Sequence, residues 1–169
     1  LVPAGGAGSV VVRANGANSN AVPFTMLTTL GAVTGVANRT KAGYAARATA
    51  TYQRPPRDPA APRTFEVQVA WYRNGSQLFA IERFTLGDLS GLREAAVNAS
   101  VRTEAPPPYR VVVRARETLR DGTAYSAVFS CNSDTPVSGQ PACSTADLPS
   151  PVGTVLSEAT SEITIDSLP

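Results

Sequence analysis

The chain has 169 residues, of which 43% are hydrophobic and 17% are charged, and its formal net charge is +2. This length fits one domain of generous size, and the apolar fraction is too high for a chain that is disordered as a whole. The sequence contains no histidine and only two cysteines, which excludes Ser-His-Asp and Cys-His catalysis, His-ligated zinc and four-thiolate metal sites.

The predicted elements are β-strands, because period-two alternation dominates and helical periodicity is scarce. In the first third of the chain we expect strands over residues 9–14, 24–30 and 44–52. Residues 1–20 form a candidate donor-strand extension, because a terminal strand can complete the sheet of a neighbouring subunit. Residues 9–14 are the better donor strand and residues 162–168 the other candidate. The alternative is that both segments are ordinary first and last strands of the sandwich.

The middle of the chain begins with a predicted hairpin. Residues 65–72 and 78–86 are its strands, and Asn74-Gly75 favours the tight turn between them. The only helical candidate is residues 86–96, where Asp or Ser could cap a short turn. A further strand is expected over residues 97–102.

The last third of the chain contains a second predicted hairpin, in which residues 109–116 and 125–131 are joined by the Asp-Gly dipeptide at 121–122. Two short strands, over residues 153–156 and 162–166, complete the set. Prolines cannot occupy central strands, and proline clusters separate the predicted strands at residues 54–56, 59–62 and 106–108.

Residues 65–69, the leucine-containing corner at 84–92 and the Tyr-x-Val-x-Val-x-Ala strand at 109–115 resemble a fibronectin type III or related immunoglobulin-like domain. The resemblance covers about half of the chain, and a long insertion that includes Asn98 separates the corner from Tyr109. It implies an extracellular binding or spacer module without catalytic residues. We therefore expect an all-β fold, an immunoglobulin-like β-sandwich of about eight or nine strands with proline-rich loops, as one domain over residues 1–169.

The cysteines and three glycosylation motifs predict an exported protein. Cys131 and Cys143 flank a loop-like segment, so we expect a disulfide, which implies an oxidising compartment; two unrelated buried thiols are the alternative. Asn-x-Ser/Thr motifs begin at Asn38, Asn74 and Asn98. The predicted location is extracellular or at the cell surface, and no apolar run is long enough to span a membrane.

Charge is distributed unevenly along the chain. Residues 1–120 carry a balance of +8 and residues 121–169 a balance of −6. Arg110, Arg114 and Arg116 lie on one face of a predicted strand, so the acidic C-terminal region could fold back on this face or dock on that of a neighbouring copy. The nearby aromatic residues fall on the opposite face, which argues against nucleic-acid binding.

Other chemistry has little support. A glycosidase needs a pair of carboxylates, but we interpret the candidates as solvated charges on strand faces: Glu66, Glu82, Asp88, Glu94, Glu104 and Glu117. A lectin-like platform could use Trp71 and Tyr72, although Trp71 shares its phase with core residues. We expect no enzyme activity, no cofactor and no bound metal.

These observations together predict a structural protein, a repeating subunit of an extracellular or cell-surface filament that assembles by terminal-strand complementation. The expected partners are other copies of the chain, with other surface proteins or glycans as further candidates. The alternative is a monomeric fibronectin III-like adhesion or ligand-binding module of a larger surface protein. The residues expected to act in assembly are Val10, Val11, Val12, Arg110, Arg114, Arg116, Glu162 and Asp166.

Overall fold

A computed structural model describes residues 7–10, 13–14, 17–18, 22–25, 29–53, 63–87, 94–119, 126–134, 143, 145–151 and 153–166. This described part of the chain is all-β, with twelve strands and no helix. The strands are β1 (Ala7–Val10), β2 (Arg13–Ala14), β3 (Ala17–Asn18), β4 (Val22–Thr25), β5 (Thr29–Thr40), β6 (Gly43–Gln53), β7 (Arg63–Arg73), β8 (Gln77–Gly87), β9 (Glu94–Thr103), β10 (Tyr109–Leu119), β11 (Ser126–Asn132) and β12 (Thr154–Ile165).

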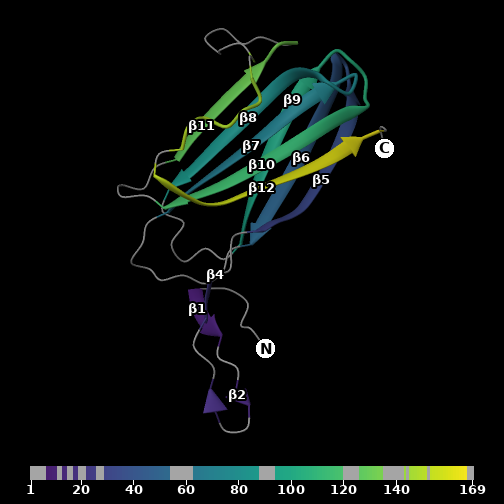
Figure 1. Ribbon diagram of the computed structural model, residues 1–169. Coiled ribbons are helices and arrows are strands. Elements are labelled where there is room, and N and C mark those ends of the chain that lie inside the picture. The colour runs from purple at the N-terminus through teal and green to yellow at the C-terminus, as the bar shows by residue number, and fades with distance from the viewer. Residues whose placement is uncertain are drawn as a thin grey trace.

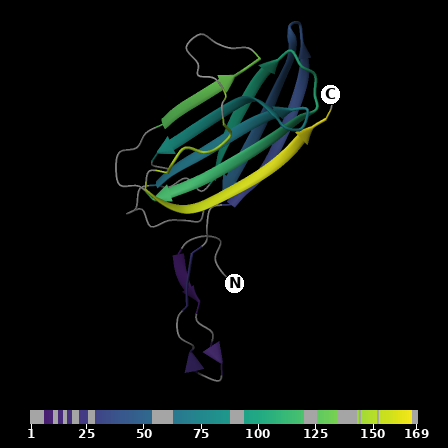
Figure 2. The same cartoon turned by 45° about the horizontal axis from the view of Figure 1, so that its top comes forward.

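Eight of these strands form two antiparallel sheets. The larger sheet has the order β11-β8-β7-β10-β12, and the smaller has the order β5-β6-β9. Figures 1 and 2 show the two sheets as stacked layers. The arrangement is therefore sandwich-like, with one core cluster drawn from both sheets.

The two inner faces differ in the size of their side chains. The larger sheet contributes bulky residues, and the smaller sheet contributes mostly alanine, so that large groups from one layer fill the space left by small groups of the other. Across the interface, the ring of Phe65 on β7 stacks on Tyr52 of β6, with 4.0 Å between the ring centroids. The buried residues include Phe65, Val67, Val69, Trp71, Phe79, Tyr109, Val111 and Val113 of the larger sheet, and Ala37, Ala46, Ala48, Ala50, Tyr52, Val97, Ala99 and Val101 of the smaller sheet.

One side of the sandwich is closed by contact between β5 and β12. A side chain at Gly35 of β5 would meet Ile163 and Ile165 of β12, since an ideal Cβ at that position would lie 2.6 Å from Cδ1 of Ile165. The absence of a side chain at Gly35 therefore lets the two isoleucines pack against the smaller sheet.

The N-terminal strands form two separate two-stranded sheets. β1 pairs with β4 and β2 pairs with β3, both antiparallel, and Figure 1 shows these strands away from the two larger sheets. We call strands β1–β4 together the N-terminal hairpin. Among the described residues, this hairpin has no strand pairing with β5–β12.

Several predicted strands are confirmed. β7 and β8 form the predicted hairpin, and at its turn Asn74 and Gly75 both have positive φ, of 49° and 77°. β6 and β9 contain the strands predicted at 44–52 and 97–102. The predicted strand at 9–14 corresponds to parts of β1 and β2, and Val11 and Val12 lie outside the described residues.

The predicted helix over residues 86–96 is wrong at both of its described ends. β8 continues to Gly87 and β9 begins at Glu94. The reason is pairing with the neighbouring strand, since the β6–β9 ladder extends to the pair Gln53↔Glu94. Residues 88–93 lie outside the described residues.

The second predicted hairpin is also wrong, because β10 and β11 are not neighbours. β10 pairs with β7 on one edge and with β12 on the other, and β11 pairs with β8. An Asp-Gly dipeptide indicates only a local turn, and here both edges of β10 are occupied by strands that are distant in sequence or follow after β11.

Two strand boundaries also differ from the prediction. The strands expected at 153–156 and 162–166 are one continuous strand, β12. The strand expected at 24–30 is instead divided between the end of β4 and the start of β5.

Candidate functional site: the arginine face, the strap and the sheet edges

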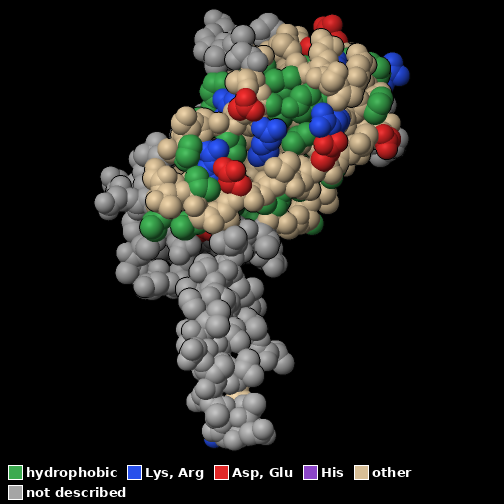
Figure 3. Space-filling view, in the orientation of Figure 1, with side chains coloured by type: hydrophobic (Ala, Val, Ile, Leu, Met, Phe, Trp, Pro, Cys, Tyr) green, Lys and Arg blue, Asp and Glu red, His purple; other side chains and the backbone are tan. Residues whose placement is uncertain are grey.

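The outer surface of the larger sheet carries a row of arginines from β10. We call Arg110, Arg114 and Arg116 the arginine face; their alternation with core residues directs them away from the smaller sheet. In Figure 3, basic and acidic side chains lie next to one another over this side of the molecule. Charges of both signs therefore meet on one face.

The acidic partners come from β12 of the same chain. Arg110 makes a bidentate contact with Glu162, with distances of 2.7 Å from Nε to Oε1 and 3.0 Å from Nη2 to Oε2. Arg116 lies 2.6 Å from Glu158 through Nε and 3.5 Å from Glu66 through Nη1. The hydrogen bond with Arg110 lowers the pKa of the Glu162 carboxyl group.

These pairs place two C-terminal acidic residues on the arginine face of their own chain. This is the first of the two arrangements considered from the sequence. Asp166 lies exposed directly after β12 and has no ion pair with any residue that the structure describes.

An extended segment crosses the same sheet face. We call residues 145–151 the strap; it has no regular secondary structure. Its backbone carbonyls accept hydrogen bonds from arginine side chains: Ala146 from Arg114 at 2.9 Å and Pro149 from Arg116 at 2.6 Å. The arginine face therefore serves as a set of donors for carbonyl groups that a strand ladder would otherwise pair.

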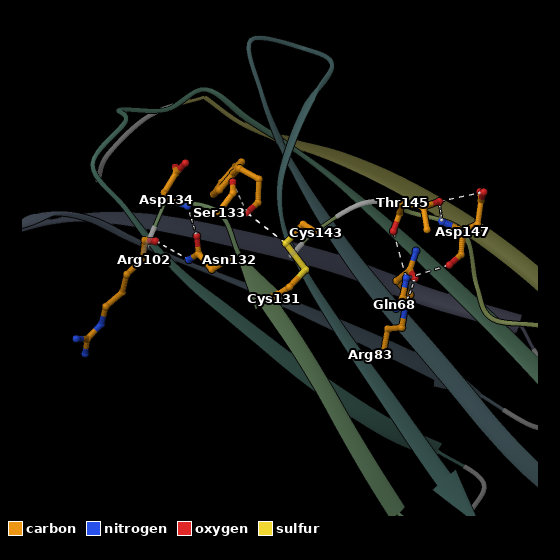
Figure 4. Close-up of a disulfide and its surroundings, with 11 residues drawn as sticks. Gln68, Arg83, Arg102, Cys131, Asn132, Ser133, Asp134, Cys143, Thr145 and Asp147 are labelled. Carbon is orange, nitrogen blue, oxygen red and sulfur yellow. Dashed lines mark hydrogen bonds between the residues drawn. A yellow bond between two sulfur atoms is a disulfide. The ribbon is translucent and has the colours of Figure 1, made fainter. Parts of the chain in front are cut away.

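Gln68 on β7 fastens the first residues of the strap. Its side chain is fully buried, its Nε2 donates to the carbonyl oxygen of Ala146, and its Oε1 accepts from Nε of Arg83 at 2.7 Å. Arg83 in turn donates to the carbonyl oxygens of Thr145 and Asp147, at 3.2 and 3.0 Å. Figure 4 shows this arrangement next to the disulfide.

A disulfide anchors the strap at its N-terminal side. Cys131 of β11 is bonded to Cys143, with 5.5 Å between the Cα atoms. Cys131 is buried with Ala70 and Ile81 in a small cluster on the outer face of the larger sheet, and Cys143 and Ala146 pack against this cluster. The strap is thus held by one covalent bond and by several side-chain donors.

The three asparagines of the glycosylation motifs all lie on the surface. Asn38 is exposed on β5, Asn74 in the β7–β8 turn and Asn98 on β9. The side chain of Asn98 accepts a hydrogen bond from Thr49 Oγ1 at 2.8 Å. The positions permit attachment of a glycan, and the modification itself stays a prediction.

A further feature is an open groove of about 710 Å³ beside the edge of β9. Glu82 of β8 reaches into it and accepts a hydrogen bond from the backbone N–H of Ser100 at 2.5 Å. Asn132 Nδ2 donates to the carbonyl oxygen of Arg102 at 2.8 Å. Two side chains of the larger sheet thus cover backbone groups on the free edge of β9.

The interpretation of Glu82 and Glu117 as solvated charges is wrong. Glu117 is only 2% exposed, and burial raises the pKa of Glu82 despite its hydrogen bond from Ser100. For Glu82 the reason is its place on the inner side of β8, opposite Val69 in the ladder, where the smaller sheet reaches its edge.

The Glu82→Gln variant tests this environment. Because the folded-state pKa of Glu82 is raised, its contribution to stability is fully present below the unfolded pKa and is lost as pH rises through the folded pKa. Glutamine keeps an oxygen acceptor for Ser100. We therefore expect the unfolding free energy of the variant, relative to wild type, to increase as pH rises from about 4 to about 7.

Urea unfolding at several pH values measures this difference, and the exposed Glu104→Gln is the control. A difference between Glu82→Gln and wild type that stays constant over this pH range would contradict the assignment.

Neither comparison with known proteins nor the arrangement of potential metal ligands among the described residues assigns a family or a metal site. No family model, curated protein or solved structure matches it. Within the described ranges, no three His, Cys, Asp or Glu side chains gather as metal ligands. No helix in the described part of the chain is long and apolar enough to cross a membrane.

Sequence reasoning missed the strap and the burial of Gln68. Gln68 alternates with apolar residues and therefore looks like an ordinary exposed position of β7. The proline-containing segment that covers it lies about 80 residues away and shows no periodicity, so no local pattern joins the two.

Proposed function

We propose that the protein is an exported, non-enzymatic structural protein, a repeating subunit of an extracellular or cell-surface filament that assembles by terminal-strand complementation. The observation that carries the proposal is the N-terminal hairpin, which forms sheets of its own and has no strand pairing with β5–β12 among the described residues. The sequence also allowed an ordinary first strand of the sandwich at this position. β1 instead pairs with β4 in a two-stranded sheet.

The energetics of small sheets support a donor role for this hairpin. An isolated two-stranded hairpin is at best marginally stable in water, and it gains stability when it joins a larger sheet. Pairing with a sheet edge of a second copy would satisfy the outward backbone groups of the hairpin. Because each copy carries one hairpin and one set of sheets, such a contact is head-to-tail and can continue as a filament.

The arginine face has a smaller part in this proposal than the sequence suggested. Arg110 and Arg116 already have acidic partners on β12 of their own chain, so docking on a neighbour would require these pairs to exchange. Assembly therefore depends chiefly on the hairpin that contains Val10.

The finer fold assignment, an immunoglobulin-like sandwich, belongs to the same proposal. It is supported by Tyr109 at the start of β10, whose hydroxyl group donates to the carbonyl oxygen of Ala105 at 2.5 Å. A tyrosine that bonds back to the upstream backbone at this corner is a feature of immunoglobulin-like sandwiches. The Cys131–Cys143 disulfide supports export to an oxidising compartment.

The second candidate function is a monomeric adhesion or ligand-binding module. The groove beside β9 favours it, since it offers charged and polar groups at an open surface: Arg47, Glu82, Ser100 and Asn132. In this case the hairpin would join the module to another part of a larger protein.

Deletion of residues 1–25 distinguishes the two functions. Electron microscopy and light scattering should show filaments of the wild-type protein, and the deletion should leave only monomers because the donor strand is lost. Deletion of residues 1–6, which leaves β1 intact, is the control and should still polymerise. A monomeric wild-type protein, or filaments of the 1–25 deletion, would contradict the proposal.

A further inference from the structure

We infer that the outer edge of β11 at Ser126 and Val128 is the acceptor in this assembly, and that β1 of a neighbouring copy is the strand that pairs with it. The inference rests on the proposed function and assigns both of its contact surfaces.

The strands at the sheet edges differ in the charges they carry. β5 contains Arg39, β9 contains Glu94 and Arg102, and β12 contains Glu158 and Glu162, whereas the seven residues of β11 include no charged residue and no proline. Charges, prolines and bulges are the usual means by which proteins prevent pairing at an exposed edge. β11 also pairs with β8 without a register shift, so its sequence has none of these protections.

The other edges are obstructed by neighbouring groups. Glu82 and Asn132 cover backbone groups of β9 at Ser100 and Arg102. The edges of β5 and β12 face each other on the closed side of the sandwich, where Ile165 packs over Gly35. A strand added at any of these edges would have to displace contacts that the fold already makes.

The ladder shows which groups of β11 point outward. Ser133 N donates to the carbonyl oxygen of Phe79 at 2.8 Å, which continues the β11–β8 pairing beyond Asn132. In an antiparallel pair the inward and outward backbone groups alternate. The odd-numbered residues of β11 therefore bond to β8, and the N–H and C=O groups of Ser126 and Val128 point away from it.

Within the N-terminal hairpin, a proline indicates the donor strand. Pro23 of β4 lies opposite Ser9 of β1. Proline is accepted in a sheet where its nitrogen faces out of the ladder, so the outer edge of β4 lacks a hydrogen-bond donor at this position. β1 contains no proline, and its outer edge has a complete set of backbone groups. Pairing of β1 with β11 would extend the larger sheet of one copy by the two strands of the next.

The Val128→Pro variant tests the acceptor, because it removes an outward N–H while leaving the β11–β8 hydrogen bonds in place. The matched control is Ala96→Pro on β9. Ser100 donates its N–H to Glu82 and therefore away from β6. Ala96 lies four residues earlier on the same strand, so its N–H also points away from β6, and its side chain is exposed. We expect Val128→Pro to raise the critical concentration for filament formation about tenfold or more, and Ala96→Pro to assemble like wild type.

Mixing two assembly-deficient variants tests both surfaces together. Val128→Pro keeps the donor hairpin, and the 1–25 deletion keeps the β11 edge, so the two monomers should form a one-to-one complex in analytical ultracentrifugation. Ser126→Pro, at the start of the strand, replaces Val128→Pro if circular dichroism shows that the latter is unfolded.

The outcomes separate the two proposals. Filaments of Val128→Pro at the wild-type critical concentration, with none from the 1–25 deletion, would overturn the β11 assignment and leave the proposed function standing. Absence of the one-to-one complex would also overturn the assignment, whereas a monomeric wild-type protein would overturn both.

Discussion

Replacement of Phe65 by alanine is expected to lower the free energy of unfolding by about 3–5 kcal/mol. The side chain is 1% exposed, and its ring stacks on Tyr52 of the opposite sheet. The facing surface consists largely of alanines, including Ala48 and Ala50. Alanine has no side-chain rotamers to change, so these residues cannot move into the cavity that the substitution leaves. Most of the loss in unfolding free energy should therefore persist.

The measurement is urea unfolding followed by fluorescence of Trp71, the single tryptophan of the chain, which is fully buried in the same core. Val36→Ala is the control, since Val36 is 42% exposed on β5, and it should change stability by less than about 0.5 kcal/mol. A loss below about 1 kcal/mol for Phe65→Ala would show that the core can repack.

The inner faces of this fold could be predicted from the sequence because they depend on local alternation. Phe65 and Trp71 share one phase of a period-two pattern, and both are buried. The β7–β8 hairpin could also be predicted, since Asn74-Gly75 provides the two positive φ angles that its turn requires.

The order of the strands could not be predicted in this way. The neighbours of β10 are chosen by the whole sheet, and a turn signal after residue 119 does not reveal that both edges of β10 are already occupied. β5 was largely missed for a related reason. Its glycines and alanines, such as Gly35 and Ala37, are weak strand formers alone. Their small size is explained only by packing against the bulky side chains of the larger sheet.

The candidate assembly surfaces could likewise be predicted from the sequence only in part. The sequence indicated an N-terminal extension and an arginine face, because composition and alternation are visible locally. It could not show that Glu158 and Glu162 pair with arginines of their own chain, since that pairing requires the β10–β12 register. The absence of charged residues in β11 likewise points to an assembly surface only when β11 is known to be an edge strand of the larger sheet.

The double variant Cys131→Ala/Cys143→Ala is expected to lower the unfolding free energy by about 3 kcal/mol, because the disulfide closes a short loop and restricts the unfolded chain. The bond also holds the strap against the larger sheet, where Ala146 accepts a hydrogen bond from Gln68. If loss of the disulfide releases the strap, that hydrogen bond is already broken when Gln68 is replaced. The effects of Gln68→Ala and of the cysteine replacements should therefore be less than additive, with a coupling of about 0.5–3 kcal/mol in a double-mutant cycle.

The matched control for this cycle is Arg110→Ala. Arg110 pairs with Glu162 on β12 rather than with the strap, so its effect should add to that of the cysteine replacements within about 0.5 kcal/mol. Urea unfolding of the single and combined variants measures the unfolding free energies from which the coupling is calculated. Additive effects of Gln68→Ala and the cysteine replacements would show that the side-chain donors hold the strap independently of the disulfide, whereas coupling confined to Gln68 would establish the strap as one unit fastened at both points.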